Sequence, residues 1–206
     1  MKRIYVDTTI VRHIARIGDE AEGWDYGDYE WVYRHYGDKP ELVSDIKALC
    51  YIVALVREWD LEFCPSNASY YELCKSIGNR ARKARETREL FVETQTNERL
   101  SKNIEKTPQG QLLDFGKIRD RLEIISDPKD REILRDFLKS GADVLLTTDY
   151  KHLANKKKRH ALASIGISVM RPAEWLDLFL KELGGDEDAV DYLERILFSV
   201  GRLQDS

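Results

Sequence analysis

Short apolar segments alternate with amphipathic ones along much of this chain, and that alternation constrains its fold more than any other feature. Each apolar segment is only a few residues long and is followed by a polar turn or a break, which is typical of strands. The predicted strands are Arg3–Val6, Leu61–Cys64, Val144–Thr147 and Ile167–Met170. Because strands that alternate with helices form parallel β-α units, we expect an α/β fold with three α/β/α layers around a central, mainly parallel sheet.

Helices between these strands are predicted from apolar residues at helical spacing and from residues that begin or end helices. Ser44 is expected to cap a helix that continues through Trp59. A second helix is predicted over 130–139, with Gly141 in the position that ends it. Pro172 suits the first turn of a third helix, which is expected to run to Leu183. Further helical segments are predicted at 79–100, 156–164 and 187–200.

The composition narrows the class of protein. A length of 206 residues allows one sizeable α/β domain, and 42% hydrophobic residues supply its core. No apolar run approaches the roughly 20 residues of a membrane helix, and no apolar leader follows Met1, so we expect a cytoplasmic protein without a membrane partner. Three cysteines without a C-x-x-C pair predict buried free thiols, and four scattered histidines give no zinc-hydrolase motif.

Charge is unevenly distributed along a chain whose formal net charge is −4. The segment 18–41 holds eight acids among many aromatic residues, whereas 75–88 is strongly basic. An acidic total excludes a uniformly basic nucleic-acid binder but not one with basic patches. The acids of 18–41 favour a packed lid or a partner-binding surface over stacking on bases. Candidate phosphate-binding residues, for which a solvated helix face is the equal alternative, are Arg80, Arg82, Lys156, Lys157, Lys158 and Arg159.

Four acids fall where a parallel sheet would bring them to one edge. Asp7 and Asp149 directly follow predicted strands, Glu72 lies early in the helix after Leu61–Cys64, and Asp130 begins the helix before the Asp149 strand. Acids crowded at one edge repel each other unless they hold a cation, and oxygen ligands suit Mg²⁺ or Mn²⁺. Taken alone, Asp130 is explained as well by the preference of helix N-termini for acids.

Three segments of the chain resemble the motifs of the PIN-domain family of nucleases. I-Y-V-D-T-T at Ile4–Thr9 looks like the first motif, and S-N-A-S-Y-Y-E at Ser66–Glu72 is similar to the second. D-R-E-I-L-R-D-F-L-K-S-G-A-D-V-L-L-T-T-D at Asp130–Asp149 resembles the carboxy-terminal motif. The strand, proline and helix of Ile167–Trp175 are similar to the usual end of the domain.

The resemblance implies a metal-dependent endoribonuclease that hydrolyses phosphodiester bonds of RNA with Mg²⁺ or Mn²⁺. Its catalytic and metal-binding residues would be Asp7, Glu72, Asp130 and Asp149, with Asp7 and Asp149 as the principal ligands. The side chains that orient these carboxylates would be Thr9, Ser69 and Thr147. Asp127, one helical turn before Asp130, competes for the place of the third acid, although the spacing of the motif favours Asp130.

The resemblance also implies how the chain is divided. It covers about 1–11, 44–77 and 120–176, so a PIN-like domain would span 1–176 with insertions at about 12–43 and 78–119. A C-terminal helical extension, 177–206, would pack on the same domain. The expected partners are an RNA substrate and, for a VapC toxin-like rather than a stand-alone PIN protein, a cognate antitoxin; a homodimer is also open. The alternatives are a DNA-directed flap-type nuclease and a non-catalytic PIN scaffold that binds RNA or protein.

Overall fold

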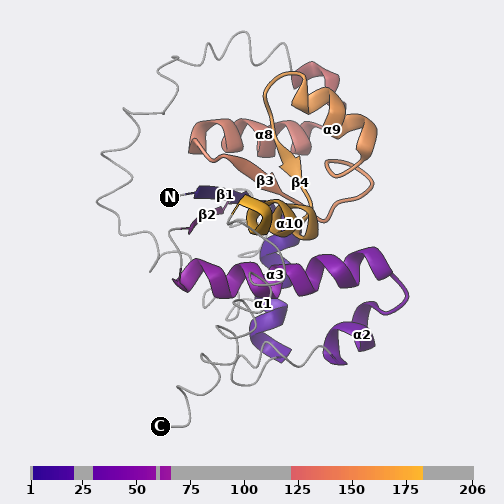
Figure 1. Cartoon of the computed structure of the whole chain (residues 1–206). Coiled ribbons are helices and arrows are strands. Elements are labelled where there is room, and N and C mark those ends of the chain that lie inside the picture. Colours follow the sequence, from indigo (N-terminus) through magenta and orange to yellow (C-terminus); the bar gives the residue numbers. More distant parts are fainter. Residues whose placement is uncertain (1, 21–29, 59–60, 66–121, 183–206) are drawn as a thin grey trace.

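The computed structural model of the chain describes residues 2–20, 30–58, 61–65 and 122–182 (Figure 1). At the centre of this part lies a four-stranded sheet of order β2-β1-β3-β4, in which every pair of neighbours is parallel. The strands are β1 (Lys2–Val6), β2 (Leu61–Pro65), β3 (Val144–Leu146) and β4 (Val169–Met170). The predicted α/β class with a parallel sheet is therefore confirmed.

The register of the sheet aligns the ends of three neighbouring strands. Val6 of β1 pairs with Leu146 of β3, and Leu146 in turn pairs with Met170 of β4. Each of these apolar strands stops where the next residue is polar, at Asp7, Thr147 and Arg171 respectively. The polar residues that follow the strands consequently share the carboxyl edge of the sheet, the usual ligand-binding edge of open α/β proteins.

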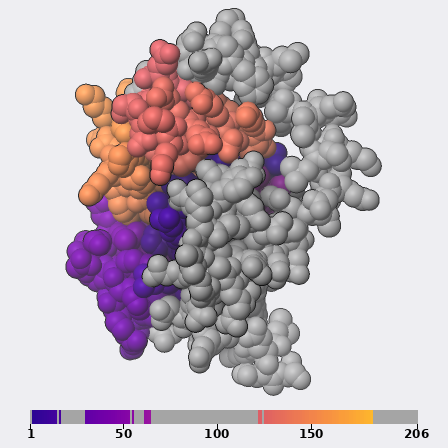
Figure 2. All heavy atoms as spheres, turned by 180° about the vertical axis from the view of Figure 1, so that it is seen from behind, coloured from indigo at the N-terminus to yellow at the C-terminus, as the bar shows by residue number. Residues whose placement is uncertain are grey.

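Helices pack on both faces of the sheet (Figure 1). Because side chains alternate along a strand, Ile4 and Val6 join a core with α1, α3 and α10, whereas Tyr5 joins a second core with α8 and α9. Figure 2, seen from behind, shows the salmon and orange residues of α8 and α9 on one side of the indigo N-terminal segment, with the purple residues of α2 and α3 on the other. The helices are α1 (Thr8–Glu20), α2 (Glu30–Tyr36), α3 (Pro40–Glu58), α8 (Pro128–Ser140), α9 (Lys156–Ala163) and α10 (Pro172–Glu182), with a short 3-10 turn, η1, at Leu122–Ile124.

Helix α8 carries two of the acids singled out from the sequence, and its ends explain where they lie. Asp127 caps its N-terminus by accepting a hydrogen bond at 2.8 Å from the backbone N–H of Lys129. Pro128 occupies the first turn, so the helix begins two residues before the predicted start at Asp130. Gly141 ends it with a left-handed φ of 64°, a conformation that favours glycine, as predicted.

Helix α3 begins earlier than the sequence predicts, at Pro40 rather than at Ser44. Ser44 therefore does not cap it, and Asp45, expected in its first turn, lies in its second. Asp45 is fully buried, and its carboxylate accepts hydrogen bonds from parts of the chain far away in sequence, which compensate for its lost hydration. The signal for this start is Pro40, a residue that suits the first helical position, and Val43, which precedes Ser44, already packs in the core.

The sequence also makes predictions about the cysteines, the aromatic residues of α2 and the presence of membrane helices. Cys50 and Cys64 are buried free thiols, as predicted, and burial raises the pKa of Cys50 to about 12, whereas Cys74 lies outside the described residues. In the aromatic-acidic segment, Trp31 and Tyr36 are packed into the core. Among the helices described, none has the length and apolar character needed to cross a bilayer.

Candidate functional site

Asp7, at the end of β1, is a buried carboxylate held by hydrogen bonds. Its Oδ1 accepts the hydroxyl of Thr9 at 2.6 Å and the backbone N–H of Ile10 at 3.0 Å, and its Oδ2 accepts the hydroxyl of Thr147. The bond from Ile10 also caps the start of α1. Burial raises the pKa of Asp7, and the bonds from Thr147 and Thr9 oppose that rise. Since each carboxylate oxygen has two lone pairs, Oδ2 keeps acceptor capacity for a ligand.

Threonine side chains connect Asp7 to the turn that carries Asp149. The Oγ1 of Thr147, which donates to Asp7, accepts the backbone N–H of Asp149 at 3.0 Å. The Oγ1 of Thr9 accepts the N–H of Thr148 at 3.2 Å and its hydroxyl at 2.9 Å. The ends of β1 and β3 are thus joined by side chains as well as by the sheet, and the two acids keep a fixed relation to each other.

Asp149 also shapes the turn that follows it. Its Oδ1 accepts the backbone N–H groups of Lys151 at 3.2 Å and of His152 at 3.1 Å. An aspartate that bonds the backbone two and three residues ahead stabilises a tight turn. Asp149 therefore fixes the backbone from which the side chain of His152 projects.

Asp45, a residue of α3, stabilises the turn after β3 through a hydrogen bond with Tyr150. Its Oδ2 accepts the hydroxyl of Tyr150, and its Oδ1 accepts the backbone N–H of Ala173 at 3.1 Å. Burial raises the pKa of Asp45, and the hydrogen bond from Tyr150 opposes that rise. One buried acid thereby ties together α3, the turn after β3 and the start of α10.

Asp130, in the first turn of α8, is buried in a different way. Its side chain is 8% exposed, and its Oδ2 is a buried atom without a hydrogen-bond partner among the described residues. Two cationic or potentially cationic atoms stand 3.8 Å from this oxygen, the Nδ1 of His152 and the Nζ of Lys158. Burial raises the pKa of Asp130 and the charges of Asp127 and Asp149 add to the rise, whereas Lys158 and His152 oppose it.

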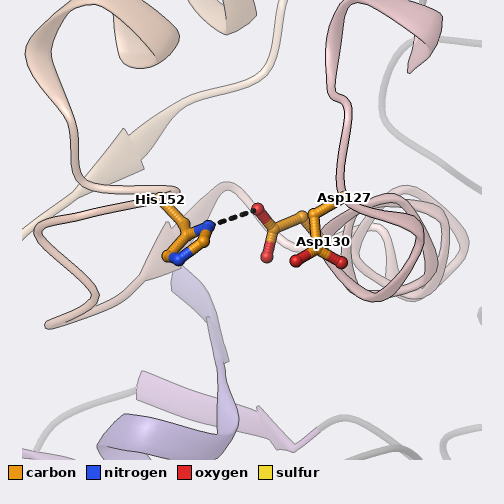
Figure 3. Close-up of side chains that lie close together, drawn as sticks. All are labelled: Asp127, Asp130 and His152. Atoms are coloured by element: carbon orange, nitrogen blue, oxygen red, sulfur yellow. Dashed lines mark ion pairs between the residues drawn. The ribbon is translucent and has the colours of Figure 1, made fainter.

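Asp127, Asp130 and His152 come together as a group of three potential metal ligands (Figure 3). One donor atom from each lies within 4.8 Å of the other two. Two carboxylates and an imidazole suit a divalent cation. The buried Oδ2 of Asp130, which accepts no hydrogen bond from the described residues, is a further sign that the donor set fits one. These three residues could hold a metal ion beside Asp149.

The four consecutive basic residues of α9, 156–159, lie in two different environments. Lys158 faces Asp130, whereas Lys156, Lys157 and Arg159 line an open groove of about 1200 Å³. The groove runs along β4 and the starts of α3 and α10, and its lining includes Glu41, Tyr150, His160, Arg171 and Glu174. Arg159 is paired with Glu174 at 2.9 Å, whereas Lys156 and Lys157 form no ion pair with any other described residue.

The structure brings together most of the predicted site residues that it describes. Asp7, Thr9, Thr147 and Asp149 form one connected network, and Asp130 lies close enough to Asp149 to interact with its charge. Their role around a metal ion stays a prediction. The predicted site residues that lie outside the described part of the chain are Ser69, Glu72, Arg80 and Arg82.

Sequence reasoning missed His152, and it treated Asp127 and Asp130 as rivals although the structure places them side by side. A signal for His152 was present, because a residue three places after a strand-end aspartate lies in the turn that this aspartate stabilises. Asp45 was missed too, since only its distant partners reveal that it is buried.

Comparison of the chain with family models, curated proteins and solved structures finds no match in any of the three. The resemblance to PIN domains therefore stays a prediction that rests on the motifs of the chain itself.

Proposed function

We propose that this chain is a metal-dependent endoribonuclease with a PIN-like three-layer α/β/α core. The observation that carries the proposal is the buried carboxylate of Asp7 at the end of the central strand, joined through Thr147 to the turn of Asp149 at the end of the neighbouring strand. Burying one acid and fixing a second beside it costs free energy. Such an arrangement is expected where the protein uses the acids to bind a cation.

The acids have distinct tasks in this proposal. A divalent ion bound at this edge would supply an activated water near neutral pH and positive charge for the transition state of phosphodiester hydrolysis. Asp7 and Asp149 offer carboxylate oxygens to the ion, and Asp130, with Glu72 by resemblance, completes the set. Thr147 and Thr9 hold the carboxylate of Asp7 in one orientation, so little reorganisation is needed when the ion binds.

The groove beside α9 supports a nucleic-acid substrate. Lys156 and Lys157 are exposed on its wall, and they follow Asp149 within a few residues. Lysines in such a place bind the phosphates that flank a scissile bond and hold the strand without reading its sequence. RNA is proposed as the substrate on the resemblance to PIN nucleases.

The test uses the full purified chain, a panel of single-stranded RNAs and Mg²⁺ or Mn²⁺. We expect cleavage that EDTA abolishes, with 5′-phosphate ends, because water attacks phosphorus and the 3′-oxygen leaves. Asp149→Asn keeps the shape of the side chain but removes its charge, so we expect a rate loss of at least about a hundredfold, roughly 3 kcal/mol of transition-state stabilisation. Asp177→Asn, which changes an exposed acid of α10, is the matched control and should cleave at the wild-type rate.

Three results would change the proposal. Cleavage that persists in Asp149→Asn would refute this site, and 2′,3′-cyclic ends would point to a different mechanism. Cleavage of DNA flaps or single-stranded DNA instead of RNA would favour the DNA-directed nuclease. Binding of RNA without cleavage of any substrate would favour the non-catalytic scaffold.

A further inference from the structure

A group of three side chains beside the predicted acids was not expected as a unit from the sequence. Asp127 comes from the cap of α8, Asp130 from the first turn of α8 and His152 from the turn after β3 (Figure 3). Their donor atoms lie within 4.8 Å of one another. Asp127 uses Oδ1 to cap α8, which leaves its second carboxylate oxygen for another partner.

The Oδ2 atom of Asp130 gives a second, independent observation. Buried carboxylate oxygens normally accept hydrogen bonds, because an unbonded one loses its hydration without replacement. This oxygen is buried and accepts none from the described residues, although His152 Nδ1 and Lys158 Nζ both face it at 3.8 Å. The two contacts are ion pairs at longer than hydrogen-bond distance, so this oxygen keeps acceptor capacity for a bound cation.

We propose that Asp127, Asp130 and His152 bind one divalent first-row transition-metal ion, with Mn²⁺ preferred over Mg²⁺. The two carboxylates suit either ion, but imidazole nitrogen is a ligand for transition metals and is seldom used by Mg²⁺. The side chain of His152 is 46% exposed, so solvent gives the ion access to the site. This inference deepens the proposed function, because it adds Asp127 and His152 to Asp130 as ligands of the ion. It rests on that function for the use of the ion in cleavage, and on the geometry of the three residues for its binding.

Lys158 lies beside the proposed metal ligand Asp130. Its ammonium group is 3.8 Å from Asp130 Oδ2 and partly neutralises that carboxylate. A metal ion bound to Asp130 would repel the ammonium group, which the flexible lysine stem can carry back to solvent. Lys158 therefore competes with the ion, and its removal should tighten metal binding.

The experiment titrates Mn²⁺ alone into the full purified chain and follows free Mn²⁺ by electron paramagnetic resonance. Electron spin-echo envelope modulation then reports whether an imidazole nitrogen is bonded to the ion. We expect nitrogen modulation in the wild type, its loss in His152→Gln, and a fall in Mn²⁺ affinity of at least about tenfold in that variant. His160→Gln, which changes an exposed histidine of α9, is the matched control and should behave as the wild type.

The variants also separate this inference from the proposed function. Lys158→Ala should bind Mn²⁺ more tightly than the wild type; weaker or equal binding would contradict the competition. Absence of nitrogen modulation in the wild type, its persistence in His152→Gln, or equal affinity for Mg²⁺ would overturn the inference. Mn²⁺ held through His152 in a chain that cleaves no nucleic acid would refute the nuclease alone, whereas cleavage with an ion that has no nitrogen ligand would refute the inference alone. Circular dichroism checks that each variant is folded.

Discussion

Asp7 and Asp130 are both buried acids near the carboxyl edge of the sheet, and burial raises the pKa of each, yet their surroundings differ. Asp7 accepts hydrogen bonds at both carboxylate oxygens, from Thr9 and Ile10 of α1 and from Thr147, which directly follows β3. The Oδ2 of Asp130 accepts none from the described residues and faces two basic side chains at 3.8 Å instead. One buried carboxylate is thus held by hydrogen bonds within the fold, whereas the other has an oxygen that the described residues leave without one.

This difference shows which acid of the proposed site is already held in a fixed orientation before a metal ion binds. The hydrogen bonds of Asp7 fix its orientation and cap α1, so this acid contributes to the fold as well as to the proposed site. Burial and its acidic neighbours disfavour the charge of Asp130, and the two ion pairs with Lys158 and His152 oppose them only in part. A bound cation would compensate the remaining cost of burying this charge, so we expect the two acids to affect stability in different ways.

The largest expected difference is in the free energy of unfolding without metal. Asp7→Ala leaves the hydroxyls of Thr9 and Thr147 and the N–H of Ile10 without their buried acceptor, so we expect a loss of about 3 kcal/mol. Asp130→Ala removes no hydrogen bond that a described residue donates to Oδ2, and it should change stability by less than about 1 kcal/mol. Urea denaturation of both variants measures the difference, and equal losses would show that the hydrogen bonds of Asp7 do not distinguish the two acids.

Much of this edge could be predicted from the sequence because its signals are local. Asp7 and Asp149 end short apolar runs, and parallel strands bring such ends together, so their common edge followed from the pattern alone. Gly141 marked the end of α8 because its left-handed conformation suits glycine. The side of the site that contains Asp7 and Thr147 was therefore open to prediction.

The remainder depends on contacts between distant parts of the chain. Tyr150 and Asp45 are 105 residues apart, and no local periodicity shows that they form a hydrogen bond. His152 lies in a turn, where the sequence fixes the backbone shape but not the direction of the side chain. Asp127 and Asp130 looked like alternatives because a motif assigns one acid, whereas a helix cap and the first turn can present two.

Asp45 extends the comparison to a second buried acid that is fully hydrogen bonded. Tyr150→Phe removes the donor to its Oδ2 and leaves a buried oxygen unsatisfied, so we expect a loss of about 2 kcal/mol in the free energy of unfolding. Tyr33→Phe is the matched control, because this residue is 55% exposed and its hydroxyl accepts a hydrogen bond from Lys47 at the surface. Thermal or urea unfolding measures both variants. A Tyr150→Phe chain as stable as the control would show that this hydrogen bond contributes nothing.

The smallest expected change, and the one whose sign is informative, comes from Asp130→Asn. The raised pKa of Asp130 means that its surroundings disfavour the charged form, so the folded state binds a proton more readily than the unfolded state does. The stabilisation that comes from this proton binding is fully present at pH values below the ordinary pKa of 3.8. It is lost as the pH rises through the raised pKa of Asp130 in the folded state. At neutral pH, without metal, the neutral amide should therefore be slightly more stable than the wild type, by about 0.5 kcal/mol.

Adding Mn²⁺ should reverse that order. An ion that binds only the folded state stabilises it by an amount that grows with the ratio of its concentration to its dissociation constant, about 2.7 kcal/mol at a hundredfold excess. The wild type has the full ligand set and should gain this stabilisation, whereas Asp130→Asn should gain much less because it offers a neutral oxygen in place of a carboxylate. Melting temperatures with EDTA and with Mn²⁺ measure both orders on the same two proteins. If Asp130→Asn melts at the higher temperature with EDTA and the wild type does so with Mn²⁺, Asp130 binds the cation and destabilises the fold without it. If Mn²⁺ raises both melting temperatures equally, the ion binds elsewhere.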